Sequence, residues 1–295
     1  PRVRIRALVL TGEPPYRLTA ATTDGLFTSR DGGTHWKKEP LTAPLAQIQA
    51  VALSAKQSSP MYVAVGGSLY VNDGSLYRHP AGEHSWILGQ GLEAESVRAV
   101  VVDPENPQVA YAGVLLQGNW SVFRTEDGGK TWKRTALPAI EPVVPDTLSL
   151  AIGKSSSGQS VLYAGTMGCG IFRTTDAGKS WDTFGRVRCD QAIQNMPADA
   201  FFLAVDPANS QQVCAASGQQ VSCSEDGGLS WRQASLVFGS PVTGLTADAI
   251  RPDTFYLITQ SSGFWYSGDG GHTWQRRGER ELAEAALTAI AAFPG

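Results

Sequence analysis

One eight-residue sequence motif occurs five times along the 295 residues and constrains the fold more than any other feature of the sequence. Self-similarity at a fixed period indicates a repeat architecture, in which one small unit is copied and stacked on its neighbours. We call each copy an octet and name it by its closing tryptophan. The copies are SRDGGTHW from residue 29, TEDGGKTW from 125, TTDAGKSW from 174, SEDGGLSW from 224 and SGDGGHTW from 267.

The closing tryptophans set the period of the repeat. A sixth, degenerate copy, HPAGEHSW, ends at Trp86 and has Ala81 in place of the aspartate. The chain therefore holds six units. The tryptophans are Trp36, Trp86, Trp132, Trp181, Trp231 and Trp274, which stand 50, 46, 49, 50 and 43 residues apart.

Each period contains four segments of strand length and none of helical length. In the third unit these segments are residues 97–104, 108–115, 121–127 and 130–137. Four strands per period of this length are typical of a propeller blade, which buries its faces against neighbouring blades. The sequence predicts an all-β, six-bladed β-propeller of four-stranded antiparallel blades, as one domain over 1–295. The predicted blades are 1–45, 46–95, 96–140, 141–190, 191–240 and 241–285, with a closing strand at 286–293.

Ring closure leaves two alternatives open. Residues 2–10 have the pattern of the first strand of the first blade, and 286–293 that of one more first strand. Either the tail adds to the first blade and closes the ring, or it begins a truncated seventh blade.

The octet has the composition of a tight turn between the third and fourth strands. Its aspartate can accept backbone N–H groups across the bend, and the Ser or Thr two residues earlier offers a second partner. Its second glycine can adopt a positive φ, and its tryptophan returns apolar area to the space between blades. The predicted structural residues are Asp31, Asp127, Asp176, Asp226 and Asp269 with Trp36, Trp132, Trp181, Trp231 and Trp274.

The pattern S/T-x-D-x-G-x-x-W resembles the Asp-box, or BNR repeat, of sialidases, bacterial xyloglucanases, sortilin-type receptors and photosystem II assembly factors. The resemblance covers essentially the entire chain and implies an Asp-box propeller. In these families the box is a structural device away from the catalytic or binding face, so it implies no particular chemistry. Photosystem II assembly factors usually have seven blades, against six here.

Four cysteines fall into two pairs that a blade could bring together. Cys214 and Cys223 are equidistant from a turn centred on Gly218 and Gln219, which makes them cross-strand neighbours. Cys169 and Cys189 lie in two loops on one face of the preceding blade. Two disulfides favour an oxidising compartment, extracellular or periplasmic. The alternative is four buried free thiols.

Functional residues are expected where the repeat is broken. The first-to-second strand turns and the octets share one face, and their sequences are nearly the same in every blade. The loops of the opposite face differ between blades. Binding sites concentrate on loops that a rigid frame holds in place. The longest insertion follows the fourth blade, and an exposed aromatic near charges and amides can hold a sugar ring or a peptide. The alternative is that Trp120 caps an interblade gap and that the charges are solvated pairs. The candidate ligand-binding residues are Trp120, Arg186, Arg188, Asp190, Gln191 and Asn195.

An enzyme is the competing hypothesis. A glycoside hydrolase needs two carboxylates roughly 5 to 9.5 Å apart, and Glu141 and Asp190 are the candidates, with Asp146 and Asp199 on the same face. A sialidase would resemble its family in an Arg-Ile-Pro motif and a tyrosine nucleophile. RIRA at 4–7 departs from that motif. Tyr62, Tyr111, Tyr163 and Tyr256 share one second-strand position and are expected to pack.

Composition narrows the choice of partner. The net charge is −3 with no basic run, so nucleic acid is not expected as a partner. No apolar stretch reaches the roughly 20 residues of a membrane helix. Metal-ligand spacing and a phosphate-binding loop are both lacking, and no cofactor is expected. We therefore predict a non-catalytic binding or assembly module for a protein or carbohydrate ligand, with a glycoside hydrolase as the alternative.

Overall fold

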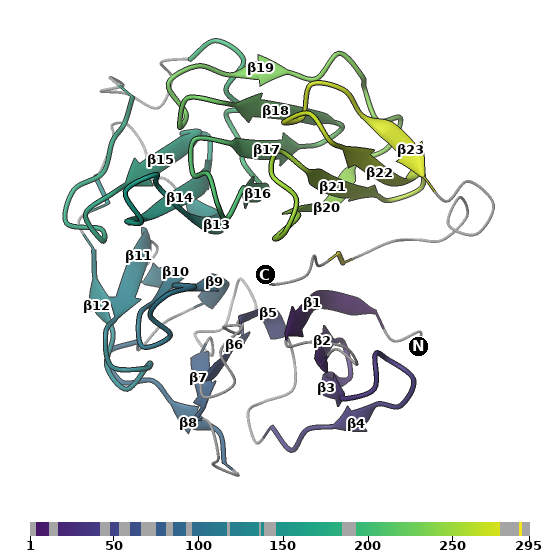
Figure 1. Ribbon diagram of the computed structural model, residues 1–295. Coiled ribbons are helices and arrows are strands. Elements are labelled where there is room, and N and C mark those ends of the chain that lie inside the picture. Colours follow the sequence, from purple (N-terminus) through teal and green to yellow (C-terminus); the bar gives the residue numbers. More distant parts are fainter. Residues whose placement is uncertain are drawn as a thin grey trace. The chain divides into compact units, whose positions relative to one another are not determined.

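The computed structural model confirms an all-β chain with the meander sheets of a six-bladed β-propeller (Figure 1). It describes residues 4–11, 17–41, 48–52, 60–65, 75–80, 85–92, 96–116, 119–135, 137–138, 146–184, 193–277 and 289–290. The described residues form strands and turns, with no helix among them. The chain divides into two compact units, Pro1–Thr135 and Ala136–Ala292, and each holds three sheets.

The sheets follow one another along the chain, and every strand pairs antiparallel with its sequence neighbour. The first unit contains β1 (Ile5–Thr11), β2 (Arg17–Thr22), β3 (Gly25–Ser29) and β4 (Lys37–Lys38), then β5 (Ile48–Ala52), β6 (Met61–Val65), β7 (Ser75–His79) and β8 (Ile87–Leu88), then β9 (Ser96–Val102), β10 (Ala110–Leu116), β11 (Asn119–Thr125) and β12 (Lys133–Arg134). The second unit contains β13 (Asp146–Lys154), β14 (Ser160–Met167) and β15 (Ile171–Thr174), then β16 (Phe202–Val205), β17 (Val213–Ser217), β18 (Gln220–Ser224) and β19 (Arg232–Gln233), then β20 (Val242–Ala247), β21 (Phe255–Thr259), β22 (Gly263–Ser267) and β23 (Gln275–Arg277).

Two places depart from the ideal blade. The fourth sheet has three named strands, and an isolated bridge between Arg173 and Asp182 stands where its fourth strand is expected. Of the predicted closing strand 286–293, only Ala289 and Ile290 are described, and neither belongs to a strand. Ile290 lies beside β20, where its Cγ2 is 2.9 Å from the position that a Cβ on Gly244 would take. How the ring closes stays a prediction.

The core is a series of apolar layers, each between two successive sheets of one unit. Trp86 lies in the layer between the first two sheets, and Trp132 in the next, where Tyr62 meets it edge-on with 5.9 Å between ring centroids. Trp231 and Trp274 lie in the two layers of the second unit. Each of these indoles is at most 9% exposed. The prediction that octet tryptophans fill the interblade space is confirmed for them.

Trp36 differs from the other octet tryptophans, because 41% of its surface is exposed. Trp181, which also stands in the first sheet of its unit, is only 9% exposed.

Every complete octet closes with the same hydrogen bonds. In the Trp132 octet, the Thr125 hydroxyl donates to Asp127 Oδ1 at 2.8 Å and accepts from the N–H of Gly129 at 2.9 Å. The N–H of Thr131 donates to Asp127 Oδ1 at 2.9 Å. The Trp36, Trp181, Trp231 and Trp274 octets repeat these contacts. The predicted turn chemistry is confirmed.

The predicted positive φ at the second glycine of the octet is confirmed, and the structure shows the same conformation at the residue before it. The second glycine has a positive φ in all five complete octets, for example 94° at Gly33 and 83° at Gly271. The residue before it is also left-handed, even where it is Ala177, with φ 64°. The aspartate bridge of the turn holds a non-glycine residue in a conformation that costs it about 1 kcal/mol or more.

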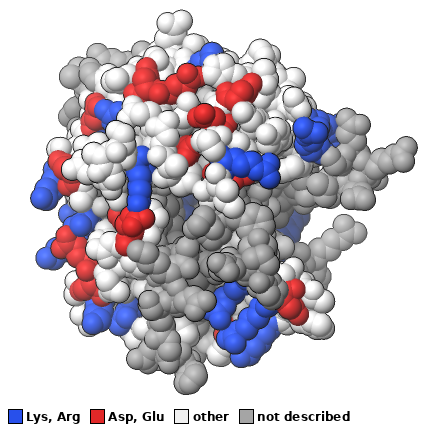
Figure 2. All heavy atoms as spheres, viewed as in Figure 1, with Lys and Arg blue, Asp and Glu red and all other residues white. Residues whose placement is uncertain are grey.

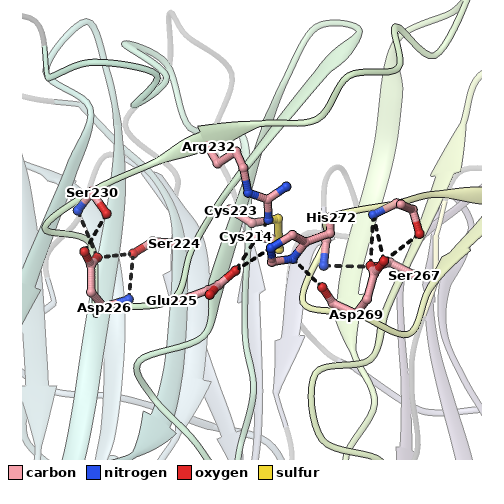
Figure 3. A network of polar contacts seen from close by, with 12 residues as sticks. Cys214, Cys223, Ser224, Glu225, Asp226, Ser230, Arg232, Ser267, Asp269 and His272 are labelled. Carbon is pink, nitrogen blue, oxygen red and sulfur yellow. Dashed lines mark hydrogen bonds and ion pairs between the residues drawn. A yellow bond between two sulfur atoms is a disulfide. The ribbon is translucent and has the colours of Figure 1, made fainter.

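The predicted disulfide between Cys214 and Cys223 is present, across the paired strands β17 and β18 (Figure 3). Both cysteines are buried. Cys169 is also buried and disulfide-bonded. Its predicted partner, Cys189, lies outside the described residues.

Candidate functional site

Two edges of each sheet can be told apart by what they carry. The octets and the first-to-second strand turns share one edge, which we call the octet edge. The N–H of Gly128 bonds to Gln108 O, and the N–H of Gly270 to Asp253 O, so octet and turn are tied within a sheet. The remaining loops form the loop edge.

The best-described part of the loop edge is a backbone-bonded platform in the second unit. The N–H of Gly170 donates to Ala198 O at 2.7 Å, and the N–H of Ala200 donates to Thr166 O at 2.9 Å. Asp199 Oδ1 accepts from the N–H of Gly168 at 2.8 Å. The loop after β14 and the segment before β16 are therefore held together as one surface.

Beneath the platform, β13 and β14 pack closely against the segment before β16. The buried Ser149 hydroxyl donates to Ala200 O at 2.7 Å. A Cβ on Gly165 would come within 2.8 Å of the Ala200 Cβ. The platform is thus preformed.

Two large apolar side chains are bare on this platform. Met167 is 42% exposed and directly follows Thr166, and Phe201 is 41% exposed and directly follows Ala200. Val237, 60% exposed, lies on the next stretch of loop edge, where the N–H of Phe238 donates to Gln219 O. Sequence reasoning missed all three. Phe201 adjoins the core strand FLAV and follows its apolar pattern, so only the structure distinguishes it.

Of the predicted site residues, the structure describes the backbone of Trp120 and the whole of Asn195. Trp120 lies in β11 opposite Leu115, but its side chain is outside the described part of the structure. The described Asn195 donates from Nδ2 to Trp231 O at 3.1 Å, which ties the insertion to the octet of the next sheet. Their ligand-binding roles stay predictions. Outside the described residues lie Glu141, Arg186, Arg188, Asp190 and Gln191.

The described carboxyl groups with a perturbed pKa are all on the octet edge, and each perturbation favours the ionised form. At Asp31 the hydrogen bonds from His35 and Ser29 lower the pKa to about 2. At Asp176 the Ser180 hydroxyl and N–H do the same. At Asp127 desolvation opposes the shift, and the hydrogen bonds from Thr131 outweigh it. These groups are acceptors within turns and not proton donors for catalysis.

The tyrosines at the shared second-strand position are packing residues, as predicted for Tyr62, Tyr111 and Tyr163, which are buried. The Tyr163 hydroxyl donates to Ser210 O at 2.8 Å, and burial raises its pKa to about 12. Tyr256 is partly exposed, and its hydroxyl donates to Asp248 Oδ2.

Two further features of the described residues are their charge distribution and their metal-binding capacity. Basic and acidic side chains are interspersed over the face shown in Figure 2. The described ranges contain no group of three His, Cys, Asp or Glu side chains that could hold a metal ion. Among the described residues there is also no helix with the length and apolarity needed to cross a bilayer.

The antiparallel meander sheets, which follow one another along the chain, define a β-propeller. No family model matches the chain. Among curated proteins, a xyloglucanase from Paenibacillus sp is 24% identical over 236 residues, which is 68% of this chain and 23% of that protein. The chain therefore spans less than a quarter of the length of that relative.

Solved structures share the fold at low identity. The GH74 enzyme of Niastella koreensis has a TM-score of 0.64 and 17% identity, over 92% of this chain and 46% of that one. YCF48 bound to D1 peptide has a TM-score of 0.65 and 16% identity, over 96% of this chain and 85% of that one. YCF48 from Cyanidioschyzon merolae has a TM-score of 0.63 and 13% identity, over 96% and 87%. At such identities the likeness shows the fold alone.

Proposed function

We propose that this chain is a non-catalytic binding module whose loop edge holds a segment of a partner protein. The observation that carries the proposal is the platform with Met167 and Phe201 bare upon it. Exposed apolar groups on a preformed surface bind with little ordering cost. A similar fold binds a peptide in the structure of YCF48 with D1 peptide.

The insertion residues predicted from the sequence are proposed to contribute polar contacts to the same binding. Arg186, Arg188, Asp190 and Gln191 precede the described segment 193–201 in the chain. Trp120, in β11 of the first unit, stays a separate prediction.

We further infer that the octets are Asp-box repeats and act as scaffold. Their aspartate carboxylates already accept hydrogen bonds within the turn, as those of Asp127 illustrate. The buried Cys214–Cys223 disulfide favours work in an oxidising compartment, extracellular or periplasmic.

The competing function is glycoside hydrolysis, favoured by the sequence similarity to the Paenibacillus xyloglucanase. A glycosidase acid needs a raised pKa. The carboxyl groups with a resolved shift, in the described part of the chain, have lowered pKa values. Asp190 and Glu141, the carboxylates predicted for a hydrolase, lie outside the described residues.

Peptide selection followed by affinity measurement tests the proposal. Peptides are selected from a random library on the whole chain, and their Kd is measured by fluorescence polarisation. We expect Met167→Ser with Phe201→Ser to weaken binding at least tenfold. The matched control, Leu229→Ser with Ile250→Ser, changes two exposed apolar residues of the octet edge in the same unit and should leave Kd unchanged.

Two results would overturn the proposal. One is that no selected peptide depends on the platform residues. The other is release of reducing sugar from polysaccharides by the wild type that is lost in an Asp190→Asn, Glu141→Gln variant, which would make the chain a hydrolase.

A further inference from the structure

Three described loop segments of the fifth and sixth sheets contain no charged residue. They are the turn 217–220, the connector 234–241 and the turn 260–262, all at the loop edge. The octet edge of the same two sheets carries most of their charge. Its charged residues are Asp206, Glu225, Asp226, Asp248, Arg251, Asp253 and Asp269. We call the three loop segments the uncharged strip.

Backbone hydrogen bonds join the uncharged strip into one surface within the second unit. The N–H of Val242, at the end of the connector, donates to Gly218 O at 2.7 Å. The N–H of Gln260, in the turn of the sixth sheet, donates to Pro241 O at 2.9 Å. The strip is therefore preformed, and a partner need not order it on binding.

Val237 projects from the strip because the next residue is anchored in the core. Phe238 is 1% exposed and meets the Trp265 and Trp274 rings edge-on, with 5.2 and 5.8 Å between ring centroids. Turning Val237 inward would withdraw Phe238 from this apolar layer. The Val237 side chain, 60% exposed, is thus held toward solvent.

The tip of the turn in the fifth sheet is a bare glycine. Gly218 has a φ of 57°, and no heavy atom lies within 4 Å of the position that a Cβ would take. The backbone of a partner can therefore come close to this turn.

The strip continues the platform that carries Met167 and Phe201. Phe202 on β16 pairs with Ala216 on β17. In that register Phe201 of the platform and Ser217 of the strip come opposite each other at the loop edge. The two surfaces are therefore neighbours within the second unit.

The platform is also nearly free of charge. Its described segments, 166–170 and 193–201, contain one charged residue, Asp199, and Asp199 Oδ1 already accepts from the N–H of Gly168. A charged group brought onto this combined surface would lose part of its hydration and find little opposite charge. An apolar group has no such cost and gains from burial.

We propose that platform and strip form one binding surface, which selects an uncharged partner segment with apolar side chains. This inference rests on the proposed function and names the chemistry of the partner. Apolar side chains of the segment cover Val237, and its backbone passes over Gly218. Binding depends on apolar burial and not on ion pairs.

A salt series tests the chemistry of the partner. The peptides selected on the whole chain are titrated by fluorescence polarisation from about 0.05 to about 0.5 M NaCl, a range over which exposed ion pairs become largely screened. We expect the Kd to change by less than about threefold, because no ion pair is lost. An interface built on ion pairs would weaken by more than that.

Two substitutions test whether the partner lies on the strip. Val237→Ser removes exposed apolar area and should weaken binding about fivefold. Gly218→Asn adds a side chain at the bare tip and should weaken it at least about tenfold, because the partner is then obstructed.

Gly158→Asn is the matched control for Gly218→Asn. Gly158 has a φ of 79°, and again no heavy atom lies within 4 Å of its Cβ position, but it belongs to the turn between β13 and β14 at the octet edge. Asparagine tolerates a positive φ, so both variants should fold. Only Gly218→Asn should change the Kd.

The outcomes separate this inference from the proposed function. Peptides that bind through Met167 and Phe201, ignore salt and lose affinity in either strip variant would support both. The inference alone is overturned if such peptides weaken by more than about threefold with salt. It is also overturned if their Kd is unchanged by both Val237→Ser and Gly218→Asn. If no selected peptide depends on Met167 and Phe201, the proposed function fails and the inference fails with it.

Discussion

Two neighbouring sheets of the second unit pack different residue pairs against the octet of the following sheet. In the fourth sheet, Tyr163 on β14 stands opposite Arg173 on β15. In the fifth, Cys214 on β17 stands opposite Cys223 on β18, at the same places in the repeat. Both pairs lie against the octet of the following sheet. The Tyr163–Arg173 pair is polar and makes hydrogen bonds beyond its own strands, whereas the Cys214–Cys223 pair is a disulfide.

The polar pair makes directional contacts. Arg173 donates to Gly227 O and to Asp182 Oδ2, each at 2.7 Å, and lies over the Phe184 ring. The disulfide has no such donors. Its sulfur atoms pack directly against Gly271, where a Cβ would meet Cys214 Sγ at 3.0 Å and Cys223 Sγ closer still. The repeat therefore sets the position of a residue pair that packs against the next octet, but it does not set which residue types occupy that position.

The largest effect is expected for Gly271→Ala. Its Cβ would overlap a buried disulfide and would also oppose a φ of 83°. We expect a loss of about 3 kcal/mol or more in the free energy of unfolding, measured by denaturant titration. Gly33→Ala is the control, because its φ is 94° and its nearest neighbour is 3.8 Å away. It should cost about 1–2 kcal/mol. Equal losses would show that overlap with the disulfide is unimportant.

Removal of the disulfide should have the next largest effect. The cysteines are 9 residues apart, and a loop of this length stabilises by about 2–3 kcal/mol through the unfolded chain. Cys214→Ala with Cys223→Ala should lower the free energy of unfolding by that amount. In this background Gly271→Ala should cost at least about 1 kcal/mol less than in the wild type, because the sulfur atoms are gone. Strict additivity would contradict the proposed contact.

The polar pair of the fourth sheet is tested by Arg173→Met. The change leaves Gly227 O and Asp182 without a half-buried donor, and we expect a loss of about 2 kcal/mol. Arg251→Met is the control, since its side chain is 68% exposed and 3.8 Å from Asp248. It should cost under about 0.5 kcal/mol. Thermal and denaturant unfolding of the two variants side by side would measure the difference.

The fold could be predicted because its determinants are local. The Asp127 bridge, the positive φ at the second glycine and the Cys214–Cys223 pairing all depend on spacing within one hairpin. That spacing lies within a single repeat, so it can be seen directly in the sequence.

The candidate sites could not be predicted, because exposure depends on what lies opposite in space. Trp36 and Trp132 have the same octet context in the sequence, yet only Trp36 is bare. Phe201 continues an apolar run and still faces solvent. His35 lies within an octet, and only its hydrogen bond with Asp31 shows that it takes the place of the hydroxyl that the other complete octets have.

The smallest effect concerns the polar contact that accompanies the disulfide at the octet edge (Figure 3). Glu225 Oε1 lies 3.0 Å from His272 Nε2 and 3.5 Å from an Arg232 nitrogen, and the Glu225 and His272 side chains are about half exposed. Glu225→Gln should lower the free energy of unfolding by under about 0.5 kcal/mol, and by less in 1 M salt, because exposed pairs are screened. A salt series of denaturant titrations measures this. A loss above about 1 kcal/mol would mean that the fifth sheet holds its neighbour through the exposed pair as well as through the disulfide, and the contrast with Arg173 would then be one of position only.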